Sequence, residues 1–398
     1  MHEAVITTGV RTAIGKIGGT LKDVLVEQLA SAVIAKCAKG IPGDPGLIDE
    51  VIFGHGKQSS DTPNLARVAS LYAELPIELP AYTVHRQCGS GLQAIVSAAQ
   101  AVRLGESRII IAGGAESMST APYYLRNARF GYSAGNGEIL DPNTESQPKS
   151  QPAEKYGRLS MGVTAENLAD KYAISRNEQD EFAFASQQRA LAAIAAGWFK
   201  DEILPFEVRI SRKETILFDT DEYPRRTTLE ELAKLKAAFK KDGSVTAGNS
   251  SGRNDGAAAV VMMELKQAEA LGLKPLARIV SYASVGVSPD IMGIGPVPAV
   301  DKALSLAGLN ISDIGLIELN EAFAAQSLAV IKELALDRAI VNVNGGAIAL
   351  GHPIGCSGAR IMVTLMYEML RRKVRYGLAT LCIAGGQGMA VVVENYAI

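Results

Sequence analysis

The stretch Cys88-Gly89-Ser90-Gly91 opens a helical run over residues 92–104, and a similar stretch, Gly355-Cys356-Ser357-Gly358, opens a second run over residues 359–372. Each run leads into a strand-like segment that ends in paired glycines, 108–114 after the first and 378–386 after the second. Two such strand–helix–strand units in one chain indicate an internal duplication. Both runs are apolar on more than one face, which is typical of helices between sheets. The sequence therefore predicts two related α/β halves stacked through central helices.

The segment between the two units breaks this pattern. Residues 131–152 are rich in Gly, Asn, Pro and Ser, which is typical of irregular structure, whereas residues 257–264 return to a strand-like core pattern. We interpret the residues in between as an insertion into the first half. The expected domains are an N-terminal half over 1–270 with an inserted loop domain at about 119–245, and a C-terminal half over 271–398.

Bulk composition excludes several classes of protein. At 398 residues, with 47% hydrophobic and 21% charged residues, the chain has the balance of a globular protein of two or three domains. Its net charge of −2 gives no general attraction to nucleic acid or to an anionic membrane, so we expect neither as a partner. The amino-terminal segment lacks the pattern of a signal peptide, and no apolar run is long enough to span a bilayer. We therefore expect a cytoplasmic location.

The cysteines are few for a chain of this length: Cys37, Cys88, Cys356 and Cys382. Four such residues do not make a disulfide framework, and they favour a reducing compartment. None belongs to a CxxC pair and the histidines offer no zinc-binding spacing, so we expect no metal site. The thiols therefore either fill the core or carry chemistry.

Cys88 lies between a short extended run and the start of a helix. The positive end of a helix and its unpaired amides stabilise a thiolate, which predicts a lowered pKa for this thiol. The glycines at 89 and 91 allow a tight turn and the close approach of a bulky ligand. A small buried cysteine at a packed turn remains the alternative.

His352 follows a glycine-rich loop over residues 342–351, where the backbone can approach a ligand. Imidazole titrates near neutral pH and is the side chain best suited to act as a base. The alternative is a loop histidine packed only for shape. His85, three positions before Cys88, is the rival base, but an extended run would carry it away from the thiol.

Cys382 ends a buried strand, where a cysteine is most often a core residue. Its position in the duplication favours chemistry, because a pseudo-twofold relation would bring equivalent strand ends together at the centre. Asn320 follows another strand and precedes a helical run. We predict that it caps this helix, and its side-chain amide can also orient a water towards a substrate.

Two glycine-rich stretches invite a nucleotide-binding interpretation that does not hold. Gly54-His55-Gly56-Lys57 lacks the earlier glycine and the Ser or Thr of a phosphate-binding loop, and residues 346–352 contain no lysine. No dinucleotide-binding fingerprint follows the first strand, which disfavours a Rossmann oxidoreductase.

Four of these segments, in this order, resemble the motifs of the thiolase family, and the resemblance covers essentially the whole chain. The segments are Arg86-Gln87-Cys88-Gly89-Ser90-Gly91-Leu92, Asn320-Glu321-Ala322-Phe323-Ala324, Asn344-Gly345-Gly346 through Gly351-His352-Pro353-Ile354-Gly355, and Cys382-Ile383-Ala384-Gly385-Gly386. The resemblance implies the thiolase fold: two duplicated βαβαβαββ halves in a five-layered α-β-α-β-α sandwich with an inserted loop domain. It also implies a homodimer or a homotetramer.

The resemblance further implies an acyltransferase of fatty acid metabolism, which condenses acetyl-CoA with acyl-CoA or cleaves 3-oxoacyl-CoA with CoA. The substrates are coenzyme A thioesters, with no separate cofactor. Cys88 is then the nucleophile, His352 its activating base, and Cys382 the acid and base at the α-carbon. One oxyanion site combines His352 with a water held by Asn320, and the other consists of the backbone amides of Cys88 and Ala384.

For coenzyme A, the resemblance places Arg225 near the adenosine phosphates and Ser251 near the pantetheine amide. Phe239 and Phe323 line the tunnel, and Met161 is assigned to the same binding site. The chain departs from the family pattern at three positions, His85, Ser160 and Ala384. A backbone amide survives alanine at 384 if φ is negative.

Two alternatives stay open. A ketoacyl-synthase-like or hydroxymethylglutaryl-CoA-synthase-like condensing enzyme shares the fold, but such enzymes lack the second catalytic cysteine that Cys382 supplies here. A non-catalytic acyl-CoA or lipid carrier on the same scaffold would have no need for Cys88, His352 and Cys382 together. Acyl-chain length and physiological direction have no signal in the sequence.

Overall fold

The computed structural model describes residues 1–397, and its first half alternates strands and helices as the duplication predicts. In chain order the elements are β1 (Ala4–Thr12), α1 (Val26–Lys39), β3 (Glu50–Gly54), α2 (Leu65–Tyr72), β4 (Ala81–Val84), α3 (Ser90–Leu104), β5 (Ile109–Ser117) and β11 (Asn254–Glu264). The strands pair in the order β4-β3-β5-β11-β1. A short strand β2 (Gly15–Lys16) adds to β11.

The second half repeats this arrangement after a linking helix α9 (Leu265–Ala270). Its elements are β12 (Ala277–Gly286), α10 (Pro296–Ala307), β13 (Leu316–Leu319), α11 (Ala324–Glu333), α12 (Ala347–Leu350), α13 (Ile354–Arg372), β14 (Tyr376–Ile383) and β15 (Gln387–Asn395). The strands pair in the order β13-β14-β15-β12, and the strand equivalent to β4 is reduced to one bridge between Ile317 and Val341. The same strand order in both halves confirms the duplication.

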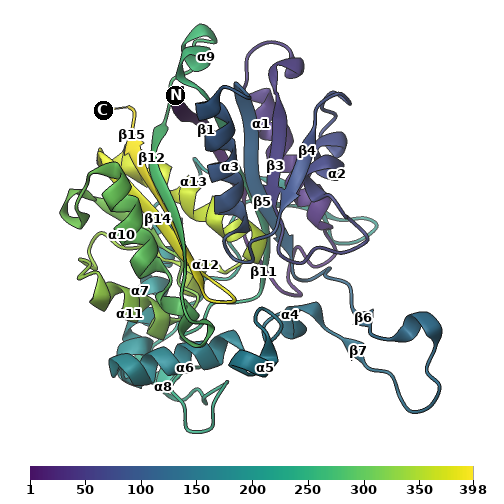
Figure 1. The fold of residues 1–398 in the computed structure, drawn as a ribbon, viewed down its shortest axis with the longest axis vertical. Coiled ribbons are helices and arrows are strands. Elements are labelled where there is room, and N and C mark those ends of the chain that lie inside the picture. Colours follow the sequence, from purple (N-terminus) through teal and green to yellow (C-terminus); the bar gives the residue numbers. More distant parts are fainter. Residues whose placement is uncertain (398) are drawn as a thin grey trace.

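The two halves form one sheet path that folds round the central helices. Antiparallel pairing of β1 with β12 at Val5–Arg278 and Ile6–Ala277 joins the two regions. Figure 1 shows α3 and α13 between the two sheet regions, α1 and α2 outside the first, and α10 and α11 outside the second. Three separate apolar clusters fill the spaces between these layers. The predicted five-layered sandwich is confirmed.

The central helices approach so closely at their N-terminal ends that only glycine fits there. A Cβ on Gly91 would lie 2.7 Å from the carbonyl oxygen of Gly355, and a Cβ on Gly358 would lie 2.4 Å from the amide nitrogen of Leu92. The contacts are reciprocal, as a pseudo-twofold relation requires. The glycine common to both quoted stretches, Gly91 in the first and Gly358 in the second, is therefore explained by the crossing of α3 and α13.

We expect Gly358→Ala to destabilise the protein by about 1–3 kcal/mol, because the added methyl group meets backbone that cannot move aside. Urea unfolding followed by circular dichroism measures this loss. Gly286→Ala is the matched control, since its Cβ would have one neighbour, 3.9 Å away. Equal midpoints for the two variants would contradict the close crossing.

The chain leaves the first sheet after Ser117, pairs briefly with the end of β1 at Ile203 and Leu204, and rejoins the sheet in β11 at Asn254. The elements of this excursion are β6 (Tyr124–Leu125), β7 (Ile139–Leu140), α4 (Pro142–Glu145), α5 (Ala153–Tyr156), α6 (Met161–Tyr172), α7 (Arg176–Ala195), β8 (Ile203–Leu204), β9 (Phe206–Arg209), β10 (Thr215–Phe218) and α8 (Leu229–Ala233). Helices α6 and α7 pack on α11 of the second half, while β6 and β7 form an arm that projects from the body (Figure 1).

A buried charge cluster fastens the excursion to the first strand. The guanidinium of Arg11 donates to Glu202 at 2.7 Å and to both oxygens of Asp221 at 2.7 and 2.8 Å. All three side chains are buried. Within the described residues, none of the helices combines the length and apolarity that crossing a bilayer requires.

Candidate active site

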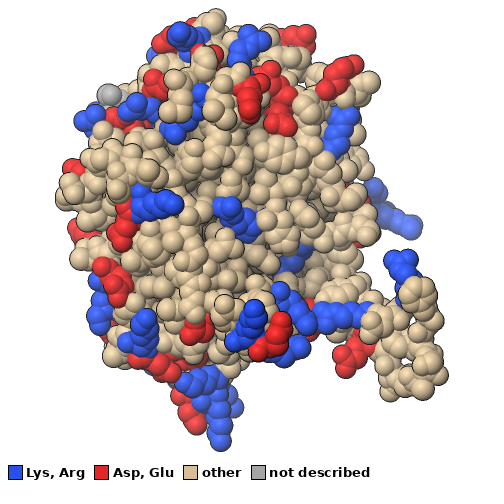
Figure 2. Space-filling view, in the orientation of Figure 1, with Lys and Arg blue, Asp and Glu red and all other residues tan. Residues whose placement is uncertain are grey.

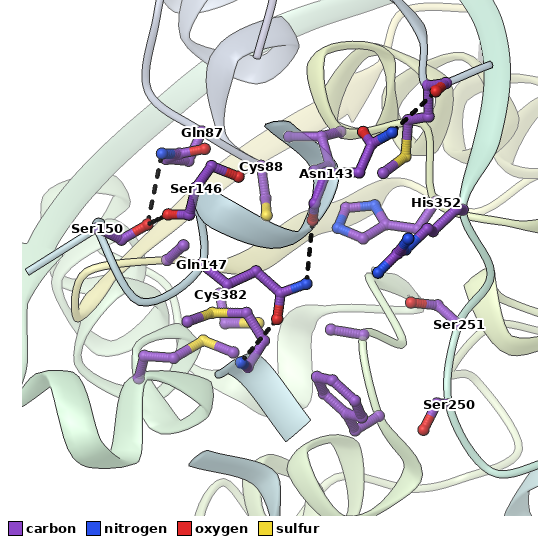
Figure 3. Close-up of a pocket in the computed structure, with 18 of the residues that line it drawn as sticks. Gln87, Cys88, Asn143, Ser146, Gln147, Ser150, Ser250, Ser251, His352 and Cys382 are labelled. Atoms are coloured by element: carbon purple, nitrogen blue, oxygen red, sulfur yellow. Dashed lines mark hydrogen bonds between the residues drawn. The ribbon is translucent and has the colours of Figure 1, made fainter. Parts of the chain in front are cut away.

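One cavity collects most of the residues that the sequence singled out. Its lining includes Cys88, Met161, Phe239, Ser251, Phe323, His352, Cys382 and Ala384. These residues come from the first half, the insertion and the second half. Figure 3 shows Cys88, His352 and Cys382 around the same space. The two thiols belong to opposite halves of the duplication, so the cavity lies where the halves meet.

Cys88 lies in the turn between β4 and α3, and the preceding Gln87 has a positive φ of 46°. The side chain of Ser90 holds this turn by accepting from the amide of Arg86 at 2.8 Å. The predicted lowering of the thiol pKa is wrong. Burial raises the pKa of Cys88, and the amide of Ala384 and the charge of Lys57 oppose this rise without cancelling it. At neutral pH the resting group is therefore a thiol.

His352 is held from both sides between α12 and α13. Its backbone amide donates to Asn254 Oδ1 at 2.9 Å, and its Nδ1 lies 2.5 Å from Ser357 Oγ. Ser357 Oγ also lies 2.8 Å from the carbonyl oxygen of Pro353. With Nδ1 occupied in this way, Nε2 is the ring nitrogen left for the cavity. Burial first, and the charge of Arg360 second, lower the pKa of His352 to about 4, so the ring is neutral at physiological pH.

Cys382 is 1% exposed and lies near the end of β14. Burial first, and the neighbouring Cys88 second, raise the pKa of its thiol well above the usual range. A cysteine in this state keeps its proton at rest and gives up or takes one only when a reacting group is beside it.

Ala384 begins the turn that follows Cys382. Gly385 and Gly386 adopt φ values of 89° and 86°, whereas Ala384 is not among the residues with positive φ. Its amide lies close enough to the Cys88 thiol to oppose the rise that burial causes in the pKa of that group. The amide that a glycine would supply is therefore present, and it already points at the position of the nucleophile.

Asn320 does not line the cavity, and its predicted role as a helix cap is wrong. Helix α11 begins at Ala324 with Phe323 as its cap residue, because the amide of Ala322 bonds back to the carbonyl of Asn320 and closes a turn first. Asn320 is fully buried, and neither polar atom of its side chain has a partner within residues 1–397. Buried amides in proteins are nearly always bonded, often to an ordered water.

The aromatic wall of the cavity is tightly built. The rings of Phe239 and Phe323 meet edge to face with centroids 5.9 Å apart. A Cβ on Gly162 would lie 2.1 Å from the ring of Phe239, so glycine is required beside Met161 for this ring to reach the cavity. Ser251 is fixed next to this wall by donating its amide to the carbonyl of Ala322 at 3.0 Å.

Arg225 is not among the residues that line the cavity. Its guanidinium lies 5.4 Å from the ring centroid of Tyr223, and that ring packs against Gly252 beside Ser251. The structure therefore connects Arg225 to the cavity through Tyr223. The departures at His85 and Ser160 also lie outside the lining: His85 is exposed, and Ser160 caps α6 by accepting from the amide of Val163 at 3.3 Å.

A second wall of the cavity was missed in the sequence. It consists mainly of Lys57, Met118, Asn143 of α4, and the residues Ser146, Gln147 and Ser150 that follow α4. Lys57 was considered only as part of a phosphate loop. It lies three residues after the end of the parallel strand β3, whose carboxyl end lies at the same sheet edge as that of β4. This position after a strand end is the feature of the sequence from which Lys57 could have been predicted to lie near Cys88.

Comparisons with known proteins agree with this geometry. Residues 4–266 match the thiolase N-terminal domain and residues 273–395 match the thiolase C-terminal domain. The chain belongs to the thiolase family. It is similar to an acetyl-CoA acetyltransferase of Pseudomonas aeruginosa, with 52% identity over 99% of this chain and 100% of the relative.

Solved structures give the same result. A Bacillus anthracis acetyl-CoA acetyltransferase superposes with a TM-score of 0.96 at 49% identity, covering 99% of each chain. A human mitochondrial 3-ketoacyl-CoA thiolase superposes with a TM-score of 0.94 at 45% identity, again covering 99% of each chain. The protein is therefore a thiolase-type acyltransferase, and nothing in these comparisons supports the other condensing enzymes or a carrier.

Proposed function

We propose that this thiolase transfers an acyl group between coenzyme A and acetyl-CoA through an acyl-cysteine, forming or cleaving 3-oxoacyl-CoA. The observation that carries the proposal is the meeting of two thiols from opposite halves with a neutral imidazole on one cavity. The names of the relatives, acetyl-CoA acetyltransferase and 3-ketoacyl-CoA thiolase, support the same substrates. Such substrates belong to fatty acid metabolism.

In the first half-reaction, Cys88 attacks the thioester carbonyl while His352 Nε2 takes the thiol proton. The ring is able to accept this proton because its pKa near 4 keeps it neutral, and because residues 1–397 offer a hydrogen-bond partner to its Nδ1 but none to its Nε2. Charge that develops on the carbonyl oxygen is held by the backbone amides of Cys88 and Ala384. Collapse of the adduct breaks the carbon–sulfur bond to CoA, whose thiolate recovers the proton from His352.

In the second half-reaction, His352 Nε2 accepts the thiol proton of Cys382, and the Cys382 thiolate then removes a proton from the α-carbon of acetyl-CoA. The resulting carbanion attacks acyl-Cys88, the carbon–sulfur bond to Cys88 breaks, and the departing thiolate takes its proton back from His352. The enolate oxygen needs a donor at His352 Nε2 and a second donor, for which we propose a water on the unpaired amide of Asn320. Ser357 Oγ lies within bonding distance of both Nδ1 and the Pro353 carbonyl. Its hydroxyl therefore supports either ring tautomer: a bare Nε2 for the first half-reaction and an Nε2–H for the second.

Coenzyme A is proposed to lie along the aromatic wall. Because all four residues line the cavity, we propose that Ser251 bonds the pantetheine amide and that Phe239, Phe323 and Met161 pack against the arm. Arg225, stacked on Tyr223 outside the cavity, is then available to the adenosine phosphates. The reaction as written uses only these side chains and coenzyme A thioesters, so we propose no separate cofactor and no metal.

The oligomeric state and the compartment are part of the same proposal. Strand β4 ends the sheet with an open edge, and Phe130 on the projecting arm is 96% exposed. The face in Figure 2 carries its charged residues mostly round the rim. These features support a homodimer or a homotetramer. Four free cysteines, two of them in the cavity, support a reducing compartment such as the cytoplasm.

The rate of Cys88 acetylation should stay constant from neutral pH down to about pH 5 and fall only near pH 4. The reason is that the pKa of His352, lowered from 6.5 to about 4, keeps the base unprotonated over this range. Stopped-flow release of CoA after a pH jump measures this rate. A half-loss near pH 6.5, with an unchanged circular dichroism spectrum, would contradict the proposed state of the imidazole.

The proposed function is tested by supplying acetoacetyl-CoA and CoA to the purified protein and following loss of the 3-oxoacyl thioester. We expect two acetyl-CoA molecules per substrate consumed, with ping-pong kinetics. A carrier would bind the thioester without consuming it. Formation of a 3-oxoacyl product that CoA then fails to cleave would indicate one of the other condensing enzymes.

A further inference from the structure

Lys57 is fixed at the wall of the catalytic cavity by its backbone. It follows β3, and its amide donates to Glu116 Oε1 at 3.1 Å. The same carboxylate receives the amides of Gly56 and Gly355 at 3.0 and 2.9 Å and lies 3.2 Å from His55 Nε2. Glu116 therefore positions Lys57, but its oxygens are occupied by these four groups.

The ammonium group of Lys57 lacks an anionic partner. The residue is 7% exposed, and among the described residues Nζ donates to the carbonyl of Pro142 at 3.4 Å and to the hydroxyl of Ser146. No carboxylate of residues 1–397 lies within ion-pair distance of Nζ. An ammonium has three N–H donors, and burying a cation against neutral acceptors alone is costly. Burial accordingly lowers the pKa of Lys57, although the charge of Glu116 opposes this.

The ammonium of Lys57 lies on one side of Cys88, and the wall proposed to hold coenzyme A lies on the other side. Figure 3 shows Ser146, which holds the ammonium, on the other side of Cys88 from Ser250 and Ser251. In a thioester the acyl chain and the pantetheine arm leave the carbonyl carbon in opposite directions. With the arm along Ser251, the acyl chain runs from Cys88 towards Lys57.

A second cation, Arg253, also lines the cavity but is already engaged. Its guanidinium lies 3.6 Å from Asp141 and donates to Thr144 at 3.3 Å, and the side chain is 43% exposed. Lys57 is therefore the cation with donor capacity to spare on the acyl side. Met118, which lines the same cavity, adds apolar surface for the chain.

We propose that Lys57 binds a carboxylate at the far end of the acyl chain, so that the preferred substrates are 3-oxoacyl-CoA thioesters of dicarboxylic acids. This inference rests on the proposed function. The Lys57 ammonium would form a charge-assisted hydrogen bond with the terminal carboxylate, which an unsubstituted acyl chain lacks. An unsubstituted chain would instead leave the buried ammonium desolvated and unpaired.

The test compares thiolysis of 3-oxoadipyl-CoA with 3-oxohexanoyl-CoA, and of the corresponding eight-carbon pair, in the wild-type protein, Lys57→Met and the surface control Lys36→Met. We expect kcat/KM of the wild type and the control to favour the carboxylated member of at least one pair about tenfold or more. Lys57→Met should shift that ratio by about 10–100-fold towards the unsubstituted chain. Lys57→Arg, which keeps the charge, should retain the preference.

Three results would overturn the inference. The first is a wild-type ratio at or below one for both pairs. The second is a ratio that Lys57→Met leaves unchanged, including the case in which both substrates lose rate equally because the ammonium acts on Cys88 alone. The third is loss of the preference in a folded Lys57→Arg. Failure to cleave any of the four thioesters would overturn the proposed function itself, which separates the two conclusions.

Discussion

Replacing Cys88 with Ser should abolish the acyl-enzyme and reduce thiolysis by about 10⁴-fold or more. The hydroxyl is a far weaker nucleophile than the thiol, and the neutral base beside it has a pKa of only about 4, too low to compensate. Incubation with acetyl-CoA followed by mass spectrometry of the intact protein, together with steady-state thiolysis, measures both effects.

Cys37→Ala is the control for this variant. Cys37 is a buried residue of α1 that belongs to an apolar cluster and does not line the cavity, so its loss should change stability but leave acetylation intact. Thiolysis at the wild-type rate in a folded Cys88→Ser protein would show that another group carries the acyl chain.

Cys382→Ser should separate the two half-reactions. Acetylation of Cys88 should continue, because attack on the thioester depends on His352 and on the amide of Ala384, whose position does not require the second thiol. Carbon–carbon bond formation should fall by about 10²–10⁴-fold, since the proton at the α-carbon then lacks its base. Exchange of deuterium from solvent into acetyl-CoA, measured by mass spectrometry, reports the same step directly.

The contradicting result is equally clear. If Cys382→Ser lost neither deuterium exchange nor condensation, the second thiol would have no part in proton transfer. If it lost acetylation as strongly as condensation, the two thiols would not divide the reaction between them, and the assignment of Cys382 to the second half-reaction would be wrong.

The duplication made the fold predictable from the sequence. Gly91 and Gly358 mark the crossing of the central helices, and they are visible because backbone contact admits no other residue there. The excursion was recognised from its composition, but the sequence gives no signal for residues 246–253, which form no strand of their own. Their place is decided by contacts such as the bridge of Ser250 to Phe323, which no local pattern encodes.

Residues whose chemistry and sequence motif point to the same role could be predicted from the sequence. Properties set by burial in the folded protein, such as a pKa or a missing ion-pair partner, could not. The helix position of Cys88 indicated a lowered pKa, yet burial among the residues of both halves outweighs the helix end. The sequence placed Asn320 directly before a helix and so predicted a cap. In the structure its carbonyl instead accepts from the amide of Ala322, and this extra turn moves the start of α11 to Ala324. Lys57 was not predicted as a site residue. Its surroundings in the cavity wall, where it donates to the carbonyl of Pro142 instead of a carboxylate, are set by tertiary packing against α4.

The measurement that tests the account most directly is peptide mapping of the protein after brief exposure to acetyl-CoA alone. The account predicts one acetyl group on Cys88, equimolar release of CoA, and no label on Cys382, followed by complete removal of the label when free CoA is added. Acetylation of Cys382, or steady thiolysis with no acetyl group on Cys88 at any time, would contradict it.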